Sequence, residues 1–464
     1  MDVAESIQRE RGLLRERLRR REPWLELGAF LALFALYSPL LANVVQNGDA
    51  AGYNEQIDSG VFASREIHVG YMVLGRAFRT LLPLPTDAAL NVMALTLGIA
   101  GLAALYLTAK RWSSRRAAMG SVLCALCSVD YVRSMVLSEV DILSASLVVI
   151  AYACYALQRP IIAGAVFGLA MLSTPVTLSM IPLFVFTFAL DERGWGGTVK
   201  VQCLRVLRFG LAGLVVYAPW VMWHWHAYFW GKRGVFTSPY AHFDAHEQIG
   251  RCLDVFKDNA WGLLPLFLVG LLSALWSRRR WQQDQPAIGI MLSVITTALL
   301  VDRAGDVPVH LPTFPLVGLV VCLFLDRLAE ASRWVWAVPC GAFLVMGIPA
   351  YLTSRAEVDE RRALKKSYVE MRDQSAPLSA MLVDLPKGFS THRFFEHYAQ
   401  SEAPTLPDFR RRLRALSSGP ERYVIYFATR VPKDIEERLS DRYEATVRTV
   451  NGERYPVLVP RASP

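Results

Sequence analysis

Long apolar segments recur from Trp24 to Leu352, and they constrain the fold more than any other feature of the sequence. A transmembrane helix needs roughly 20 predominantly apolar residues, and many of these segments approach that length. After Leu352 the chain becomes polar, with dense Arg, Glu, Asp and Lys up to Pro464. The 464 residues are 53% hydrophobic and 20% charged, whereas a soluble chain usually carries about a quarter charged residues. This pattern excludes a soluble single-domain enzyme, a disordered chain and a disulfide-rich secreted protein.

The sequence predicts an all-α polytopic membrane protein with about eleven transmembrane helices, followed by a small C-terminal α/β soluble domain. Three regions are expected: a basic cytoplasmic arm at 1–23, a transmembrane domain at 24–352 and an extracytoplasmic domain at 353–464. The spans are expected at 24–45, 87–109, 117–130, 140–157, 160–173, 176–190, 207–226, 261–276, 286–301, 309–325 and 333–352.

The basic residues indicate the orientation of these spans. With the N-terminus inside, the inside segments carry more than twice as many Lys and Arg residues as the outside loops, which agrees with the positive-inside rule. The net charge of +9 therefore indicates membrane topology rather than nucleic-acid binding. An odd number of spans places the C-terminal domain outside. Arg greatly exceeds Lys, which favours a GC-rich bacterial genome and an inner membrane; in an endoplasmic reticulum membrane the same topology would place this domain in the lumen.

Two short motifs have ordinary structural interpretations. Cys124 and Cys127 form a CxxC inside an apolar span, where cysteine packs as a small hydrophobe. His242 and His246 are spaced to bind zinc on a helix, but no further ligand is evident. The alternative is an aromatic loop, from about 227 to 260, that covers a site.

Four polar clusters fall on the outer side of the predicted membrane, where charge is costly and usually functional. Asp49 lies in a Gly-rich loop after the first span and could act as a general base or bind a cation, although such a residue is also a common turn former. The second cluster begins at His68 and continues into an apolar helix with Arg76. The others are a short loop at 130–141, where Ser138 is expected to cap the following helix, and the loop at 302–312.

Several motifs follow one another in a recognisable order. They are Gly48-Asp49 after span one; His68 with Tyr71 and Leu74-Gly75-Arg76-Ala77-Phe78; Asn91 in span two; Glu139-Val140; Gly168-Leu169-Ala170 up to Pro182; and His310-Leu311-Pro312 up to Pro315. Together these motifs resemble those of the GT-C superfamily of membrane glycosyltransferases, in its protein O-mannosyltransferase-like branch.

The resemblance implies transfer of a sugar, mannose or another hexose, from a polyprenyl-phosphate carrier to an acceptor hydroxyl of a protein or glycan, with inversion, on the periplasmic or lumenal face of the bilayer. The leaving phosphate needs cations and the acceptor needs a base. The implied catalytic residues are Asp49, Glu139 and Asp141. Arg133, Arg303 and His310 would hold the donor phosphate, and Glu55, His68, Tyr71 and Arg76 would contact the acceptor. A divalent cation stays open as a cofactor, and no other is expected.

Two other interpretations stay open. A transporter or lipid flippase usually shows charges at mid-membrane depth and internal repeats, and the sequence shows neither. A catalytically degenerate subunit with a GT-C fold is compatible with Asp141 and Thr174-Pro175, where this sequence departs from the family pattern.

The C-terminal region has its own secondary-structure signals. The pattern predicts a helix over 355–372, a strand over 423–427, a helix over 433–442 and a hairpin over 443–459 that turns at Asn451-Gly452. No catalytic constellation is evident here, so the domain is expected to cap the site or recognise the acceptor. His392 and His397 are expected to be structural or at the surface.

Overall fold

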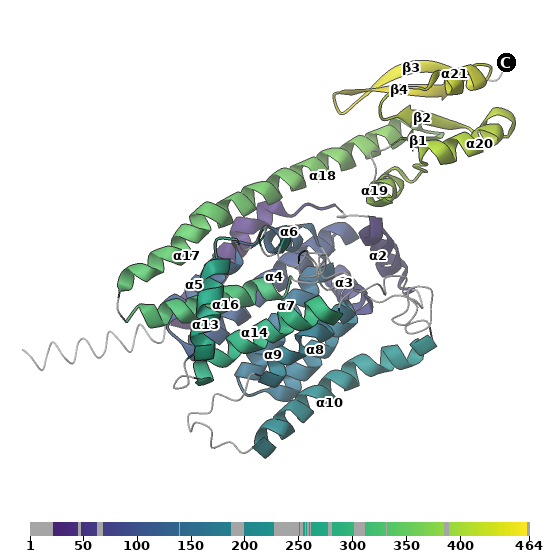
Figure 1. Ribbon diagram of the computed structural model, residues 1–464. Helices are drawn as coiled ribbons and strands as arrows, with labels where there is room; N and C mark the ends of the chain where they lie inside the picture. Colours follow the sequence, from purple (N-terminus) through teal and green to yellow (C-terminus); the bar gives the residue numbers. More distant parts are fainter. Residues whose placement is uncertain are drawn as a thin grey trace, which may run out of the picture.

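The computed structural model describes residues 22–44, 48–62, 68–138, 140–186, 199–226, 250, 254, 255, 257, 259, 261–276, 281–300, 311–330, 332–384 and 389–461. A bundle of helices forms the larger part, and one long helix, α18 (Ile348–Ser375), carries a small domain beyond one end of the bundle (Figure 1). The predicted fold class, mostly helical with a small C-terminal sheet, is confirmed at this level.

The number of spans differs from the prediction. In the described segments, four helices are long and apolar enough to cross a membrane: Glu22–Leu40, α4 (Thr86–Trp112), Val201–Trp223 within α10 (Val199–Trp223), and Arg333–Ser375, which comprises η3 (Arg333–Trp336), α17 (Ala337–Ala342), η4 (Phe343–Gly347) and α18. A fifth is obtained if α5 (Arg115–Ala125) and α6 (Val129–Leu137), which are bent by 74°, count as one.

The expectation of eleven spans is therefore wrong for the described chain, and the helix breaks explain why. Hydropathy detects an apolar run, but a run that contains a cap or a turn folds into two shorter helices. The predicted span 117–130 ends in this way, because the side chain of Ser128 accepts a hydrogen bond from Tyr131 N at 3.2 Å and starts α6. Other apolar stretches in the described chain, at 140–156, 160–173, 175–186, 264–273 and 287–297, are only 10–17 residues long.

The centre of the bundle is formed by α7 (Val140–Ala156), which packs against α4 and α8 (Pro160–Ser173). On one side α5 packs against α16 (Thr313–Leu328), and Cys124 and Cys127 are buried as free thiols there, as predicted. The remaining elements of the bundle are η1 (Ser38–Leu40), α2 (Gly48–Ser59), α3 (Val69–Leu81), η2 (Pro175–Met180), α9 (Ile181–Phe186), α13 (Leu264–Trp276) and α14 (Trp281–Leu300).

Helices α8 and α10 approach each other through glycines. A Cβ atom at Gly164 would lie 2.1 Å from the carbonyl oxygen of Phe209, and one at Gly168 would lie 2.6 Å from that of Gly213. Backbone therefore packs against backbone, as small residues four apart allow between helices in a membrane. The opposite face of α10 is apolar and exposed, with Leu211 and Val215 pointing away from the bundle.

Replacing Gly164 by Leu is expected to separate α10 from α8, because neither backbone can yield without moving a whole helix. The cost is about 1–3 kcal/mol or more. The thermal unfolding midpoint of the purified protein in lipid would report it. Gly210→Leu is the matched control, since Gly210 has open space at its Cβ position; an equal loss in both variants would contradict the packing argument.

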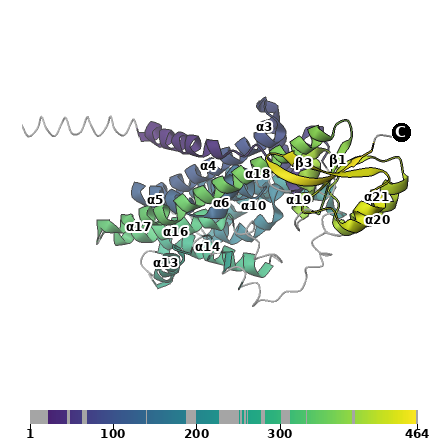
Figure 2. The same cartoon turned by 90° about the horizontal axis from the view of Figure 1, so that it is seen from above.

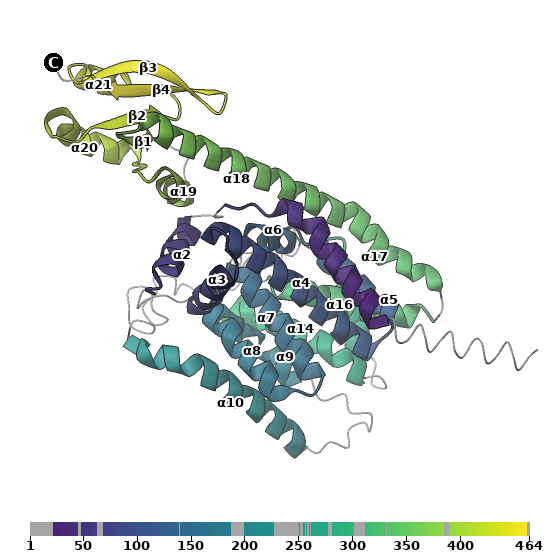
Figure 3. The same cartoon turned by 180° about the vertical axis from the view of Figure 1, so that it is seen from behind.

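Helix α18 runs without a break across the expected domain boundary at residue 353. Its first turns lie beside the first helix (Figure 3). There the rings of Tyr37 and Tyr351 are 5.4 Å apart, and Tyr351 donates a hydrogen bond to Leu36 O at 3.5 Å. Its later turns are polar and reach the C-terminal domain. The predicted helix over 355–372 is therefore confirmed as part of a longer one.

The C-terminal domain contains a four-stranded sheet of order β1-β2-β4-β3, and it lies at the opposite end of the molecule from α17 (Figure 2). Strand β1 (Ser379–Val383) pairs in parallel with β2 (Tyr423–Phe427), and β3 (Tyr443–Val450) and β4 (Glu453–Pro460) form an antiparallel hairpin. The predicted strand at 423–427 and the turn at Asn451-Gly452 are confirmed; both turn residues have positive φ, 49° and 86°. The helices are α19 (Phe389–Ala399), α20 (Leu406–Ser418) and α21 (Lys433–Leu439).

Candidate functional site

Four segments that are distant in the sequence meet at the end of the bundle nearest the C-terminal domain. The ring of Tyr53 on α2 lies 5.6 Å from that of His68 and 5.8 Å from that of Tyr71, both edge-on. His68 and Tyr71 lie at the start of α3. His68 contacts the last residue of α8, and Tyr71 donates a hydrogen bond to the residue that ends α6. The motif segments that the sequence analysis selected are therefore neighbours in space.

His68 is held by the end of α8. Its Nδ1 lies 2.5 Å from the carbonyl oxygen of Ser173, which can only accept, so Nδ1 carries the proton. The second ring nitrogen, Nε2, then faces away from Ser173. The backbone of His68 also starts α3, since its carbonyl oxygen accepts hydrogen bonds from Tyr71 N at 3.0 Å and Met72 N at 3.3 Å. This arrangement fixes the orientation of the imidazole at the edge of the site.

Tyr71 is completely buried, and its hydroxyl group contacts the segment that links α6 to α7. The hydroxyl donates to Ser138 O at 3.1 Å and lies 3.3 Å from Ser138 Oγ. Ser138 is the C-cap of α6, with φ 56° and ψ 52°. The expectation that Ser138 caps the following helix at its N-terminus is wrong, because residues 129–137 form a helix of their own and Ser138 ends it.

The loop expected around Asp49 is instead the start of helix α2, which begins at Gly48. The following Ala50-Ala51 and the later Glu55-Gln56 favour helix, and this outweighs the flanking glycines. The side chain of Asp49 lies outside the described residues, as do Glu139, Arg303, His310, His242 and His246. Asp141 stands in the first turn of α7 and is half-buried, and Glu55 is exposed on α2.

Arg76 was predicted to contact the acceptor, and the structure gives it a structural partner. Its guanidinium donates to Ile57 O at 2.8 Å, in the last turn of α2. Gly60, with φ +71°, leaves room for it, since a Cβ there would lie 2.2 Å from Arg76 Nη1. One turn further on, Arg79 donates to Thr86 Oγ1 at 3.2 Å, and Thr86 donates to Asp58. Both arginines thus fix the position of α2.

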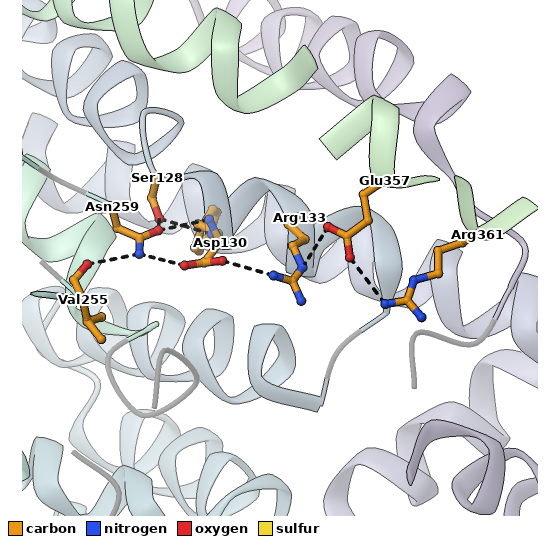
Figure 4. A network of polar contacts seen from close by, with 8 residues as sticks. Ser128, Asp130, Arg133, Val255, Asn259, Glu357 and Arg361 are labelled. Atoms are coloured by element: carbon orange, nitrogen blue, oxygen red, sulfur yellow. Dashed lines mark hydrogen bonds and ion pairs between the residues drawn. The ribbon is translucent and has the colours of Figure 1, made fainter. Parts of the chain in front are cut away.

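Arg133 on α6 lies between two carboxylates. Its Nη1 is 3.5 Å from Asp130 Oδ1, and its Nε is 3.2 Å from Glu357 Oε2 on α18 (Figure 4). Asn259 extends the network by donating to Asp130 Oδ2 at 2.7 Å, and Arg361 lies 3.6 Å from Glu357 Oε1. The network joins α6 to α18. Asp130 and Glu357 already neutralise the positive charge of Arg133, which was expected to bind the donor phosphate.

Other polar residues near these segments carry no obvious sequence signal. Asn54 on α2 and Thr174 after α8 are buried, and neither Asn54 Oδ1 nor Thr174 Oγ1 has a hydrogen bond to a residue that the structure describes. Buried polar atoms without partners are uncommon and often mark functional sites. Only the unusual Thr174-Pro175 pair was noticeable in the sequence. Across the described ranges, no three His, Cys, Asp or Glu side chains are grouped to hold a metal ion.

The C-terminal domain contacts the bundle at Asp87, in the first turn of α4. Lys365 Nζ on α18 lies 2.8 Å from Asp87 Oδ2, and the hydroxyl of Tyr398 on α19 donates to the same oxygen at 3.1 Å. Lys365 also donates to Asn43 O at 2.7 Å. Helix α19 packs on α2 as well, so the domain sits directly beside the helix that carries Asp49.

His397 lies beside Tyr398 at this contact, and its surroundings shift its pKa. Burial lowers the pKa of His397 below its ordinary value of 6.5, and Lys365 adds to this, while Asp87, Glu55 and Asp58 act in the opposite direction. Because the folded state favours the neutral imidazole, the unfolded chain binds more protons just below pH 6.5.

The free energy of unfolding is therefore expected to fall as the pH drops from 6.5 towards the lowered pKa of His397. The contribution of the neutral His397 to stability is fully present above pH 6.5. Thermal unfolding midpoints at about pH 5 and about pH 8 would show it, with His397→Asn removing part of the difference. The same pH dependence in both proteins would contradict the role of His397.

Comparisons with known proteins show which family and which solved structures the chain resembles. Residues 76–223 match the family model described as dolichyl-phosphate-mannose-protein mannosyltransferase, and this range runs from the second half of α3 to the end of α10. No curated protein matches the chain.

The crystal structure of ArnT from Cupriavidus metallidurans in the apo state is similar, with a TM-score of 0.60, 13% identity, and coverage of 95% of this chain and 98% of that chain. The same protein bound to undecaprenyl phosphate gives a TM-score of 0.63, 13% identity, and coverage of 93% and 97%. A weaker likeness, with a TM-score of 0.48, is found to the oligosaccharyltransferase of Archaeoglobus fulgidus, at 13% identity and with coverage of 92% and 72%. The chain therefore has the fold of the GT-C superfamily, and its resemblance to the membrane glycosyltransferases of that superfamily is confirmed.

Proposed function

We propose that this protein transfers a sugar, mannose or another hexose, from a polyprenyl-phosphate carrier to a hydroxyl group of a protein or glycan acceptor. The observation that carries the proposal is the convergence of α2, the start of α3, the α6–α7 link and the end of α8 at one end of the bundle. The family match over 76–223 and the fold of ArnT, which binds undecaprenyl phosphate, support the same conclusion.

The roles follow from what the reaction needs. Asp49, at the start of α2, takes the proton of the acceptor hydroxyl, and Glu139 and Asp141 orient the acceptor or a divalent cation. Arg303 and His310 stabilise the leaving phosphate. Arg133 supports this side of the site indirectly, since Asp130 and Glu357 engage its guanidinium. Attack by the hydroxyl oxygen on the anomeric carbon, opposite the phosphate, inverts the configuration.

Of the acceptor-side residues, His68 is the best placed. Its imidazole is oriented by Ser173 O at the edge of the site and packs edge-on against Tyr53, and Glu55 is exposed on α2. Tyr71 and Arg76 instead hold protein backbone in place. The proposed location is a bacterial inner membrane, or alternatively the endoplasmic reticulum, with the N-terminus cytoplasmic and the C-terminal domain periplasmic or lumenal.

The test is transfer of labelled sugar from a series of polyprenyl-phosphate carriers by the purified protein in lipid, with and without chelator. Transfer from at least one carrier is expected, and the chelator reports whether a cation takes part. Folded protein that transfers nothing from any carrier, with peptide or glycan acceptors, would contradict the proposal and favour a transporter or a degenerate subunit.

A further inference from the structure

Ser138 has a backbone conformation that its residue type rarely adopts. With φ 56° and ψ 52° it lies in the left-handed region, where residues other than Gly, Asn and Asp are uncommon. The residue is 3% exposed, and its amide donates back to Ser134 O to close the last turn of α6. Strain of this kind persists only where the surroundings hold it, and it concentrates at functional sites.

The surroundings that hold Ser138 come from a different helix. Tyr71, 67 residues earlier in the chain, is 0% exposed and donates its hydroxyl to Ser138 O at 3.1 Å. The same hydroxyl lies 3.3 Å from Ser138 Oγ. The ring of Tyr53 packs edge-on against Tyr71, so α2, α3 and α6 are joined at this point.

The position of Ser138 in the chain gives this contact its significance. Ser138 directly precedes Glu139 and stands three residues before Asp141. The proposed function assigns both of these carboxylates to the reaction. A left-handed residue sets the direction in which the chain leaves a helix. Whatever fixes Ser138 therefore affects the direction in which the chain enters α7, which carries Asp141 in its first turn.

We infer that Tyr71 and Ser138 form a positioning pair: the Tyr71 hydroxyl holds the left-handed backbone of Ser138, and this positions the start of α7, with Asp141 in its first turn, relative to the reacting groups. The inference rests on the proposed function and changes the role of Tyr71, which the sequence analysis placed in contact with the acceptor. The complete burial of Tyr71 and the engagement of its hydroxyl by Ser138 support the positioning role.

The experiment compares Tyr71→Phe, Ser138→Val and Ser138→Gly in sugar transfer from the carrier. Tyr71→Phe removes only the hydroxyl, and Ser138→Val makes the left-handed backbone costly, so each is expected to lower kcat by about 10- to 100-fold with KM nearly unchanged. Ser138→Gly permits the conformation without strain and is expected to stay within about threefold of the wild type.

Hydrogen exchange of the amides at 140–143 provides a readout that needs no activity. In Tyr71→Phe and Ser138→Val exchange is expected to rise about tenfold or more in that segment, while α8 residues 163–170 stay unchanged. If the wild type transfers nothing from any carrier, the proposed function fails, but the exchange result still decides the positioning pair. If Tyr71→Phe does not fold, Ser138→Val against Ser138→Gly decides it.

Three outcomes would overturn the inference. An increase in KM for the acceptor with kcat unchanged in Tyr71→Phe would make Tyr71 a substrate contact. Equal losses in Ser138→Gly and Ser138→Val would mean that the serine hydroxyl itself is required. Unchanged exchange at 140–143 in both Tyr71→Phe and Ser138→Val would show that the pair does not hold this segment.

Discussion

Asp49→Asn is expected to abolish measurable sugar transfer while leaving carrier binding intact. A general base contributes about 100- to 10,000-fold to a rate, and an amide cannot accept the proton of the acceptor hydroxyl. Asp49 stands at the start of α2, and α2 is fixed at its other end by Arg76 and Asp58. The helix is therefore a rigid support, and the loss is expected in kcat rather than in KM.

The matched control for this change is Asp441→Asn. Asp441 is an exposed residue of the C-terminal domain, so the same chemical replacement is made far from the site. It is expected to transfer sugar at the wild-type rate. Steady-state kinetics with labelled carrier, and carrier binding measured separately, would check both variants. Folded Asp49→Asn protein that retains the wild-type kcat would move the role of base to Glu139 or Asp141.

The sequence predicts which segments meet at this site better than it predicts the contacts between them. The order of motifs selected Asp49, His68 and the segment around Glu139, and the structure brings the described parts of these segments together. The contacts that hold them were not predictable, because Tyr71 and Ser138 are 67 residues apart and His68 and Ser173 are 105 apart. Nothing in a single sequence pairs residues at such separations.

The secondary structure was predictable where local chemistry decides it. The hairpin turns at Asn451-Gly452 because both residues tolerate positive φ, and strand 423–427 follows from its β-branched and aromatic residues. The span count failed for the opposite reason. Mean hydropathy does not detect where a helix breaks. The 74° bend at 126–128 depends on the Ser128 cap and on the packing of α6 against α18.

Loss of the Asp87 carboxylate is expected to loosen the C-terminal domain from the bundle. Asp87 Oδ2 accepts from both Lys365 and Tyr398, and its Oδ1 accepts from Ala88 N at 3.0 Å, so one carboxylate joins α4, α18 and α19. Breaking a fully buried ion pair costs about 3–5 kcal/mol, but Lys365 is 32% exposed and water replaces part of the interaction. Asp87→Ala is therefore expected to cost about 1–3 kcal/mol in the free energy of unfolding.

An exposed aspartate on α18, Asp359, provides the control for the buried Asp87. Asp359 on α18 pairs with Arg355 at 3.9 Å, and their side chains are 57% and 62% exposed. Asp359→Ala is expected to cost at most about 0.5 kcal/mol, as exposed pairs usually do. Denaturant titration of both variants would measure the difference, and a double-mutant cycle of Asp87→Ala with Lys365→Met would isolate the ion pair. Equal costs at the two positions would mean that Asp87 does not hold the domain.

A larger cost at Asp87, together with reduced transfer, would instead show that the domain must be docked beside α2 for the site to work, because α19 packs on the helix that carries Asp49.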